Sequence, residues 1–297
     1  MAKIAFVKTT NRSEGVRKAI ELLGTNPVSG KSVFLKPNYN SAHPAPGSTH
    51  PDVLRSLVKE LQRFGAGRIT VGDRSGMGDT RQVMGELGVF EMAEELGFEP
   101  LVFDELESNQ WVRHQPDGSH WKEGFLFAQP CLDCDVIVQA CCLKTHQYGG
   151  VFTMSLKNSV GMVAKKDRLT GYDYMNELHF SRNQRRMIAE INTVYSPALI
   201  VMDGVEAFRN GGPHEGERVP SELVLAGMDR VAIDAVGLAV LRYFGALKDK
   251  PIFEREQIAR AVELGLGVSS GDEIELVTAD AASAEYAREI EALLTAG

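Results

Sequence analysis

Residues 33–72 read VFLKPNYNSAHPAPGSTHPDVLRSLVKELQRFGAGRITVG and contain the unit on which the predicted fold class rests. The first three residues form a short apolar run that is typical of a buried strand. After a polar loop, Pro51 opens a segment whose leucines and valines recur every three or four residues, which predicts a helix ending at Gly65. Residues 68–72 form another strand, so this unit predicts two parallel strands joined by a helical crossover.

The same alternation continues on both sides of this unit. Further strands are expected at residues 4–7, 101–103, 135–142, 199–202, 223–226 and 274–277. Further helices are expected at residues 16–23, 83–96 with a break near Gly88, 181–194, 229–244, 254–264 and 284–294. Residues 111–127 lack a helical period and carry a turn signal at Asp117-Gly118, which predicts a hairpin excursion. The sequence therefore predicts an α/β fold: a mostly parallel sheet with helices on both faces, in Rossmann-like layers.

The composition and the apolar runs indicate how large a core the chain can bury and where in the cell we expect the protein. With 297 residues, of which 43% are hydrophobic, the chain can bury a large core. We expect a single α/β domain over residues 1–297, with a division into two lobes as the alternative, and an irregular active-site segment at residues 143–180. No apolar run approaches the roughly 18 residues of a membrane span, and the N-terminus does not resemble a signal peptide. We therefore expect a cytoplasmic protein without a membrane partner.

Charge is distributed unevenly along the chain. The net charge of −8 disfavours general nucleic-acid binding, which depends on neutralising phosphates. Residues 143–186 nevertheless hold eight basic residues against three acidic ones. The basic residues are Lys144, Lys157, Lys165, Lys166, Arg168, Arg182, Arg185 and Arg186. This island predicts a site for a small anionic ligand, with a solvated helix face and an RNA-binding surface as alternatives; the oligomeric state stays open.

Polar side chains follow four of the predicted strands. They are Lys36-Pro37-Asn38, the loop of residues 72–78 with Asp73, Lys144-Thr145-His146, and Asp203-Gly204. Because ligands of open parallel sheets bind beyond the carboxyl ends of the strands, we expect these clusters to gather at one edge. The glycine-rich loop at residues 72–78 is either a phosphate cradle or a plain strand-to-helix turn.

These motifs resemble those of a family called domain of unknown function 362. Its signature is matched by Leu143-Lys144-Thr145-His146 and by TMSLKNSVG at residues 153–161. Other matches, in family order, are Lys36-Pro37-Asn38, Thr49-His50-Pro51, Val71-Gly72-Asp73 and residues 201–204, 212–216 and 229–235. The resemblance covers nearly the whole chain, agrees with the site at the strand ends, and implies that Thr153, Lys157 and Asn158 belong to it.

The four cysteines raise a second hypothesis. Many members of the resembled family carry an appended ferredoxin-type cysteine segment, which this sequence lacks. Cys131 and Cys134 have a metal-like spacing, but Cys141 and Cys142 are adjacent, and neighbours on a strand point to opposite faces. We therefore expect no cysteine-bound cluster. An iron–sulfur or metal-binding redox protein that uses these four cysteines is the alternative function.

The predicted function is an enzyme that acts on a small anionic metabolite, either a carboxylate or a phosphate. The predicted catalytic residues are His146, Lys144 and Asp203. The predicted substrate-binding residues are Lys36, Asn38, Asp73, Thr153, Lys157 and Asn158. His146 is the expected acid/base because its ordinary pKa lies nearest neutrality, and Lys144 is the competing candidate. A divalent metal on Asp73 and Asp203 is an alternative; the cofactor and reaction class stay unknown.

Overall fold

The computed structural model describes residues 1–149 and 151–295, and a ten-stranded sheet runs through them. The main strand order is β12-β1-β11-β9-β7-β2-β3-β4. These strands are β1 (Ala2–Lys8), β2 (Val33–Lys36), β3 (Ile69–Asp73), β4 (Glu99–Val102), β7 (Val136–His146), β9 (Pro197–Gly211), β11 (Leu223–Gly227) and β12 (Ile274–Thr278). All neighbours pair in parallel except β11, which is antiparallel to β1 and β9. The mostly parallel sheet predicted from the sequence is confirmed.

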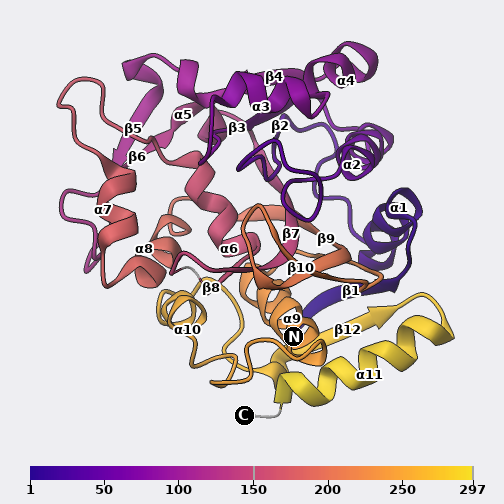
Figure 1. Cartoon of the computed structure of the whole chain (residues 1–297). Coiled ribbons are helices and arrows are strands. Elements are labelled where there is room, and N and C mark those ends of the chain that lie inside the picture. Colours follow the sequence, from indigo (N-terminus) through magenta and orange to yellow (C-terminus); the bar gives the residue numbers. More distant parts are fainter. Residues whose placement is uncertain (150, 296–297) are drawn as a thin grey trace.

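Helices cover both faces of this sheet (Figure 1). One face carries α1 (Arg12–Leu23), α2 (Pro51–Arg63), α3 (Thr80–Glu86) and α4 (Val89–Leu96). The other carries α8 (Gln184–Ile191), α9 (Arg230–Tyr243), α10 (Glu256–Glu263) and α11 (Ala281–Thr295). Side chains of β1 alternate accordingly: Ala5 and Val7 pack in the first core cluster, and Ile4 and Phe6 in the second.

The hairpin excursion is also confirmed. β5 (Trp111–His114) and β6 (Phe125–Ala128) form a separate antiparallel two-stranded sheet. Phe125 and Phe127 are fully buried in a third core cluster, which also contains Phe34 of β2 and residues of α8. This hairpin therefore extends the core beside the main sheet, at the upper left of Figure 1.

The structure differs most from expectation near residues 143–211. β7 continues to His146, and β9 runs for 15 residues to Gly211, where it turns back as β10 (Gly216–Val219). The segment expected to be irregular contains β8 (Val151–Thr153), α6 (Ser155–Asn158) and α7 (Tyr174–Phe180). Polar residues mark the strand ends in the sequence-based prediction, but the added ladders of β8 and β10 satisfy the main chain of the extended strands.

Two expectations from composition concern the molecule as a whole. Among the described residues, no helix combines the length and apolar character that a membrane crossing requires. The single-domain organisation and the cytoplasmic location stay predictions.

Candidate functional site

A cavity of about 620 Å³ lies beyond the carboxyl ends of β2, β3 and β7. Seven of the nine residues predicted for the site line it. They are Lys36, Asn38, Asp73, His146, Thr153, Lys157 and Asn158. Lys144 and Asp203 are not among the lining residues. The carboxyl ends of neighbouring parallel strands thus gather most of the polar clusters, as the topology requires.

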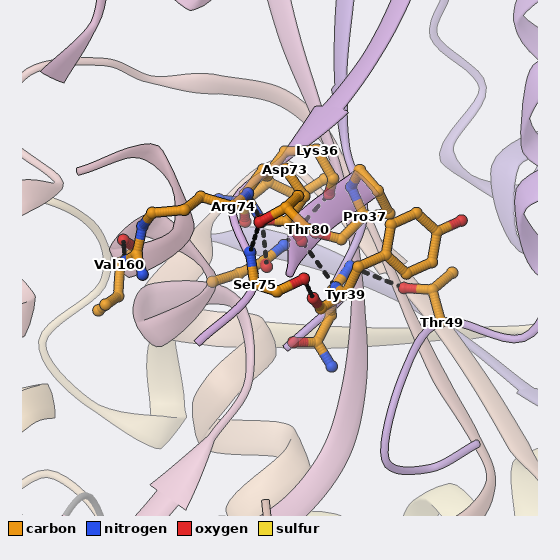
Figure 2. Close-up of polar contacts among 12 residues, drawn as sticks. Lys36, Pro37, Tyr39, Thr49, Asp73, Arg74, Ser75, Thr80 and Val160 are labelled. Carbon is orange, nitrogen blue, oxygen red and sulfur yellow. Dashed lines mark hydrogen bonds and ion pairs between the residues drawn. The ribbon is translucent and has the colours of Figure 1, made fainter. Parts of the chain in front are cut away.

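The floor of the cavity is a buried ion pair between Lys36 and Asp73, which end β2 and β3 (Figure 2). The Lys36 Nζ lies 2.7 Å from Asp73 Oδ1 and donates to the Pro37 carbonyl oxygen at 2.6 Å and to Asn158 Oδ1 at 3.1 Å. The Asp73 carboxylate also accepts from the main-chain N–H groups of Tyr39 and Arg74, both at 2.6 Å. All three donors of Lys36 are used, so this lysine holds the site together.

The Arg74 side chain forms hydrogen bonds with the segment that packs over this ion pair. Its Nε donates to the Val163 carbonyl oxygen at 2.8 Å, and its Nη2 donates to the Val160 carbonyl oxygen at 2.6 Å (Figure 2). The guanidinium therefore ties the end of β3 to the short 3-10 helix of residues 159–162. Its Nη1 has no hydrogen-bond partner within residues 1–149 and 151–295.

The glycine-rich loop after β3 already uses several of its N–H groups. The N–H of Arg74 donates to Asp73 Oδ1, that of Ser75 to Thr80 Oγ1 at 2.9 Å, and that of Met77 to the Asn40 carbonyl oxygen at 2.9 Å. A phosphate cradle needs such groups free and pointing at the ligand. The loop is therefore a strand-to-helix turn in which these three donors are satisfied by the protein.

Lys144 lies next to the cavity and connects two loops through hydrogen bonds. Its buried ammonium donates to the carbonyl oxygens of Gly47 and Pro213, the latter at 2.9 Å. Pro213 belongs to the β9–β10 turn and lines the cavity. Burial lowers the pKa of Lys144 to about 8. The lysine predicted as a catalytic candidate thus positions the cavity wall.

Lys157 projects from α6, a single turn whose start is fixed from a distant helix. Asp234 of α9 accepts hydrogen bonds from the N–H groups of Ser155 at 2.8 Å and Leu156 at 3.0 Å. Burial, followed by the positive charges of Lys144 and Arg74, lowers the pKa of Lys157 to about 7. No hydrogen-bond acceptor or carboxylate in the described part of the chain engages its amine. Lys157 is therefore a half-buried amine that faces the cavity unpaired.

His146 is present in the cavity wall, but its setting changes the chemistry predicted for it. Its side chain is buried, and its Nδ1 has no hydrogen-bond partner among the described residues. Burial, then the positive charges of Lys157 and Lys144, lower the pKa of His146 to about 2. The imidazole is consequently neutral throughout the physiological range and does not exchange a proton near pH 7.

Asp203 does not reach the site. Its Oδ2 lies 2.8 Å from Arg12 Nε, and its Oδ1 accepts from the N–H of Val205 at 3.0 Å. The expectation placed Asp203 at a strand end, whereas β9 continues for eight further residues to Gly211. Asp73 and Asp203 are each ion-paired with a different cation. The described residues contain no group of three or more His, Cys, Asp or Glu side chains that could hold a metal ion.

Several cavity residues were missed by the sequence reasoning. They are Asn40, Arg74, Tyr148, Asp173, Met175 and His179. Arg74 could have been found, because it directly follows Asp73 at the end of a predicted strand. Asp173 caps α7 and His179 lies in its last turn, and the sequence did not predict this helix, so no local signal placed them near the strand ends.

The alternative sites receive less support from the geometry. Cys131, Cys141 and Cys142 are buried, and burial raises the pKa of each thiol. Three members of the basic island form ion pairs within the protein. Lys165 lies 2.8 Å from Asp104, Lys166 lies 3.2 Å from Asp173, and Arg185 lies 2.5 Å from Glu256. Neither a thiolate cluster nor an open basic surface is favoured by these contacts.

Two known proteins and one family model are similar to this chain. The solved lactate racemase apoprotein from Thermoanaerobacterium thermosaccharolyticum is similar with a TM-score of 0.45 and 15% identity, over 69% of this chain and 50% of that chain. Thylakoid-associated protein sll1697 of Synechocystis sp. (strain ATCC 27184 / PCC 6803 / Kazusa) is 26% identical over 216 residues. That match covers 72% of this chain and 64% of the relative, which is less than two thirds of its length. The model of the family described as Domain of unknown function (DUF362) matches residues 33–239. The chain therefore belongs to this family.

Proposed function

We propose that this protein is an enzyme that binds a small anionic carboxylate in the cavity and uses Lys157 as its acid–base group. The observation that carries the proposal is the unequal use of the cations around the cavity. Five lysine or arginine side chains line it: Lys36, Arg74, Lys157, Lys165 and Lys166. Four of them already bind carboxylate or carbonyl oxygens of the protein. Lys157 is the exception among the described residues.

The protonation behaviour of Lys157 supports an acid–base role. An amine with a pKa of about 7 is present in both protonation states near neutral pH, so it can take up a proton and return it. His146 lines the same cavity and is neutral near pH 7, so it does not supply this proton exchange. The role predicted from the sequence for His146 thus passes to Lys157.

A carboxylate is favoured over a phosphate by the state of the glycine-rich loop. Three of its N–H groups donate to Asp73, Thr80 and Asn40 rather than to the cavity. Phosphate sites at such loops depend on several free main-chain donors. The side chains of Arg74 and Lys157 suit the smaller charge of a carboxylate.

A ligand-binding series tests this proposal. Small mono- and dicarboxylates, phosphate esters and the corresponding neutral amides are added to the protein, and the melting temperature is measured. We expect carboxylates to raise it in the wild type and in Lys18→Met, whose lysine is ion-paired with Glu14 on α1, but not in Lys157→Met. Equal stabilisation of Lys157→Met, or equal stabilisation by the neutral amides, would contradict the proposal.

A further inference from the structure

The environment of Lys157 narrows the substrate class, and this step rests on the proposed function. We propose that Lys157 is a covalent nucleophile that forms an imine with a small 2-oxo acid. The amine faces the cavity from α6 and has no acceptor in the described part of the chain. Nucleophilic lysines in proteins are desolvated or placed beside another cation, so that the free amine is present at neutral pH.

The cations around Lys157 are held in place by the fold. Lys144 is fixed by the carbonyl oxygens of Gly47 and Pro213, and Arg74 by those of Val160 and Val163. Neither cation can turn away from the amine without breaking these bonds. Burial, together with their positive charge, keeps the pKa of Lys157 near 7. The fold therefore keeps part of the Lys157 population in the free-amine form at neutral pH.

Arg74 supplies a binding group for the carboxylate of a 2-oxo acid. Its Nε and Nη2 are used by carbonyl oxygens, whereas its Nη1 has no partner among the described residues. A carboxylate bound at Nη1 would lie in the same cavity as the amine of Lys157. A 2-oxo acid carries its carbonyl carbon directly beside the carboxylate. The carboxylate also offsets the positive charge that develops when the imine is protonated.

The chemical step needs no oxidant or second reactant. The Lys157 nitrogen attacks the carbonyl carbon, a C–N bond forms, and one amine proton passes to the former carbonyl oxygen. The second amine proton and the hydroxyl then leave as water when the C–O bond breaks, which gives the C=N bond. The Thr153 hydroxyl lines the cavity and can relay these protons by hydrogen bonding.

Reductive trapping on the full chain tests the inference. The protein is incubated at pH 7 with cyanoborohydride and pyruvate, 2-oxoglutarate or phenylpyruvate, and adducts are mapped by mass spectrometry. We expect one of these acids to add its mass less one oxygen atom at Lys157, on the order of 10²–10³-fold faster than at surface lysines. Lys157→Arg should lose the adduct, and Lys18→Met should keep it. The matching 2-hydroxy acid should give none.

The outcomes separate this inference from the proposed function. If carboxylates stabilise the wild type but not Lys157→Met, and no 2-oxo acid is trapped at Lys157, the imine is overturned and the proposed function stands. Adducts spread evenly over surface lysines, or retained in Lys157→Arg, overturn the imine equally. If carboxylates do not bind at all, the proposed function fails as well.

Discussion

At the scale of single residues, Lys36 and Lys157 line the same cavity but differ in their partners. Lys36 is saturated by Asp73, Pro37 and Asn158, whereas Lys157 has no partner among the described residues. We expect amine-selective labelling of Lys157 to rise with pH through about 7 and to level off above about pH 8, because only the free amine reacts. Mass spectrometry over a pH series measures this curve. A curve that still rises steeply at pH 10, as for an ordinary lysine, would refute the assignment.

Lys144 and His146 allow a paired test at the same scale. Lys144→Met removes a positive charge near Lys157, so the labelling curve of Lys157 should move to higher pH by about one unit. His146→Gln removes a side chain that is neutral near pH 7, so the curve should stay near its original position. The same mass-spectrometric titration measures both variants. A large shift in His146→Gln would show that His146 carries charge in the folded protein.

At the scale of elements, α6 depends on a carboxyl group from α9. Asp234 accepts from two N–H groups at the start of α6, and an asparagine can accept through only one oxygen. We expect Asp234→Asn to lower the free energy of unfolding by about 1–3 kcal/mol, because one buried N–H loses its partner. Urea denaturation measures this loss, and the trapping of a 2-oxo acid at Lys157 should weaken in parallel.

The pH dependence of stability gives a second test of the same contact. Burial raises the pKa of Asp234 to about 7, so the folded protein holds this proton more tightly than the unfolded chain does. The contribution of Asp234 is therefore fully present below about pH 4 and is lost as the pH rises through about 7. Urea denaturation of the wild type and Asp234→Asn at pH 5 and pH 8 should show their stability difference shrinking at the higher pH. A difference that grows with pH would contradict the raised pKa.

At the scale of the whole molecule, the segment that carries Lys157 rests directly on the ion pair at the sheet edge. A Cβ atom at Gly161 would lie 2.4 Å from Asp73 Oδ1 and 2.7 Å from Lys36 Nζ. We expect Gly161→Ala to push this segment off the sheet, destabilise the fold by about 1–3 kcal/mol and abolish carboxylate binding. Gly85→Ala, within α3, is the matched control. A Cβ atom at this position would lie 3.9 Å from the Phe90 side chain, which is an ordinary van der Waals contact. Thermal melts with and without ligand compare the two; similar behaviour of both variants would contradict this arrangement.

Local sequence patterns are sufficient to predict the layers of this protein and the position of part of its site. Apolar runs and helical periods are local properties, so the parallel sheet, its helices, the break at Gly88 and the hairpin could all be predicted. Lys36 and Asp73 could be placed together for the same reason, because each directly follows the apolar core of a strand and the two strands are parallel neighbours.

The chemistry available to each side chain in that site depends on how distant segments pack around it. The four-residue helix α6 is too short for a hydrophobic period, and it is capped by Asp234, 79 positions beyond Ser155. β9 extends past Asp203, where it pairs with β10, and no local sequence pattern predicts this pairing. The pKa values of His146 and Lys157 follow from burial and from charges brought close by distant segments. Desolvation and Coulomb interactions are properties of the packed molecule. Sequence patterns therefore identify the residues of the site, whereas the fold determines their pKa values and partners.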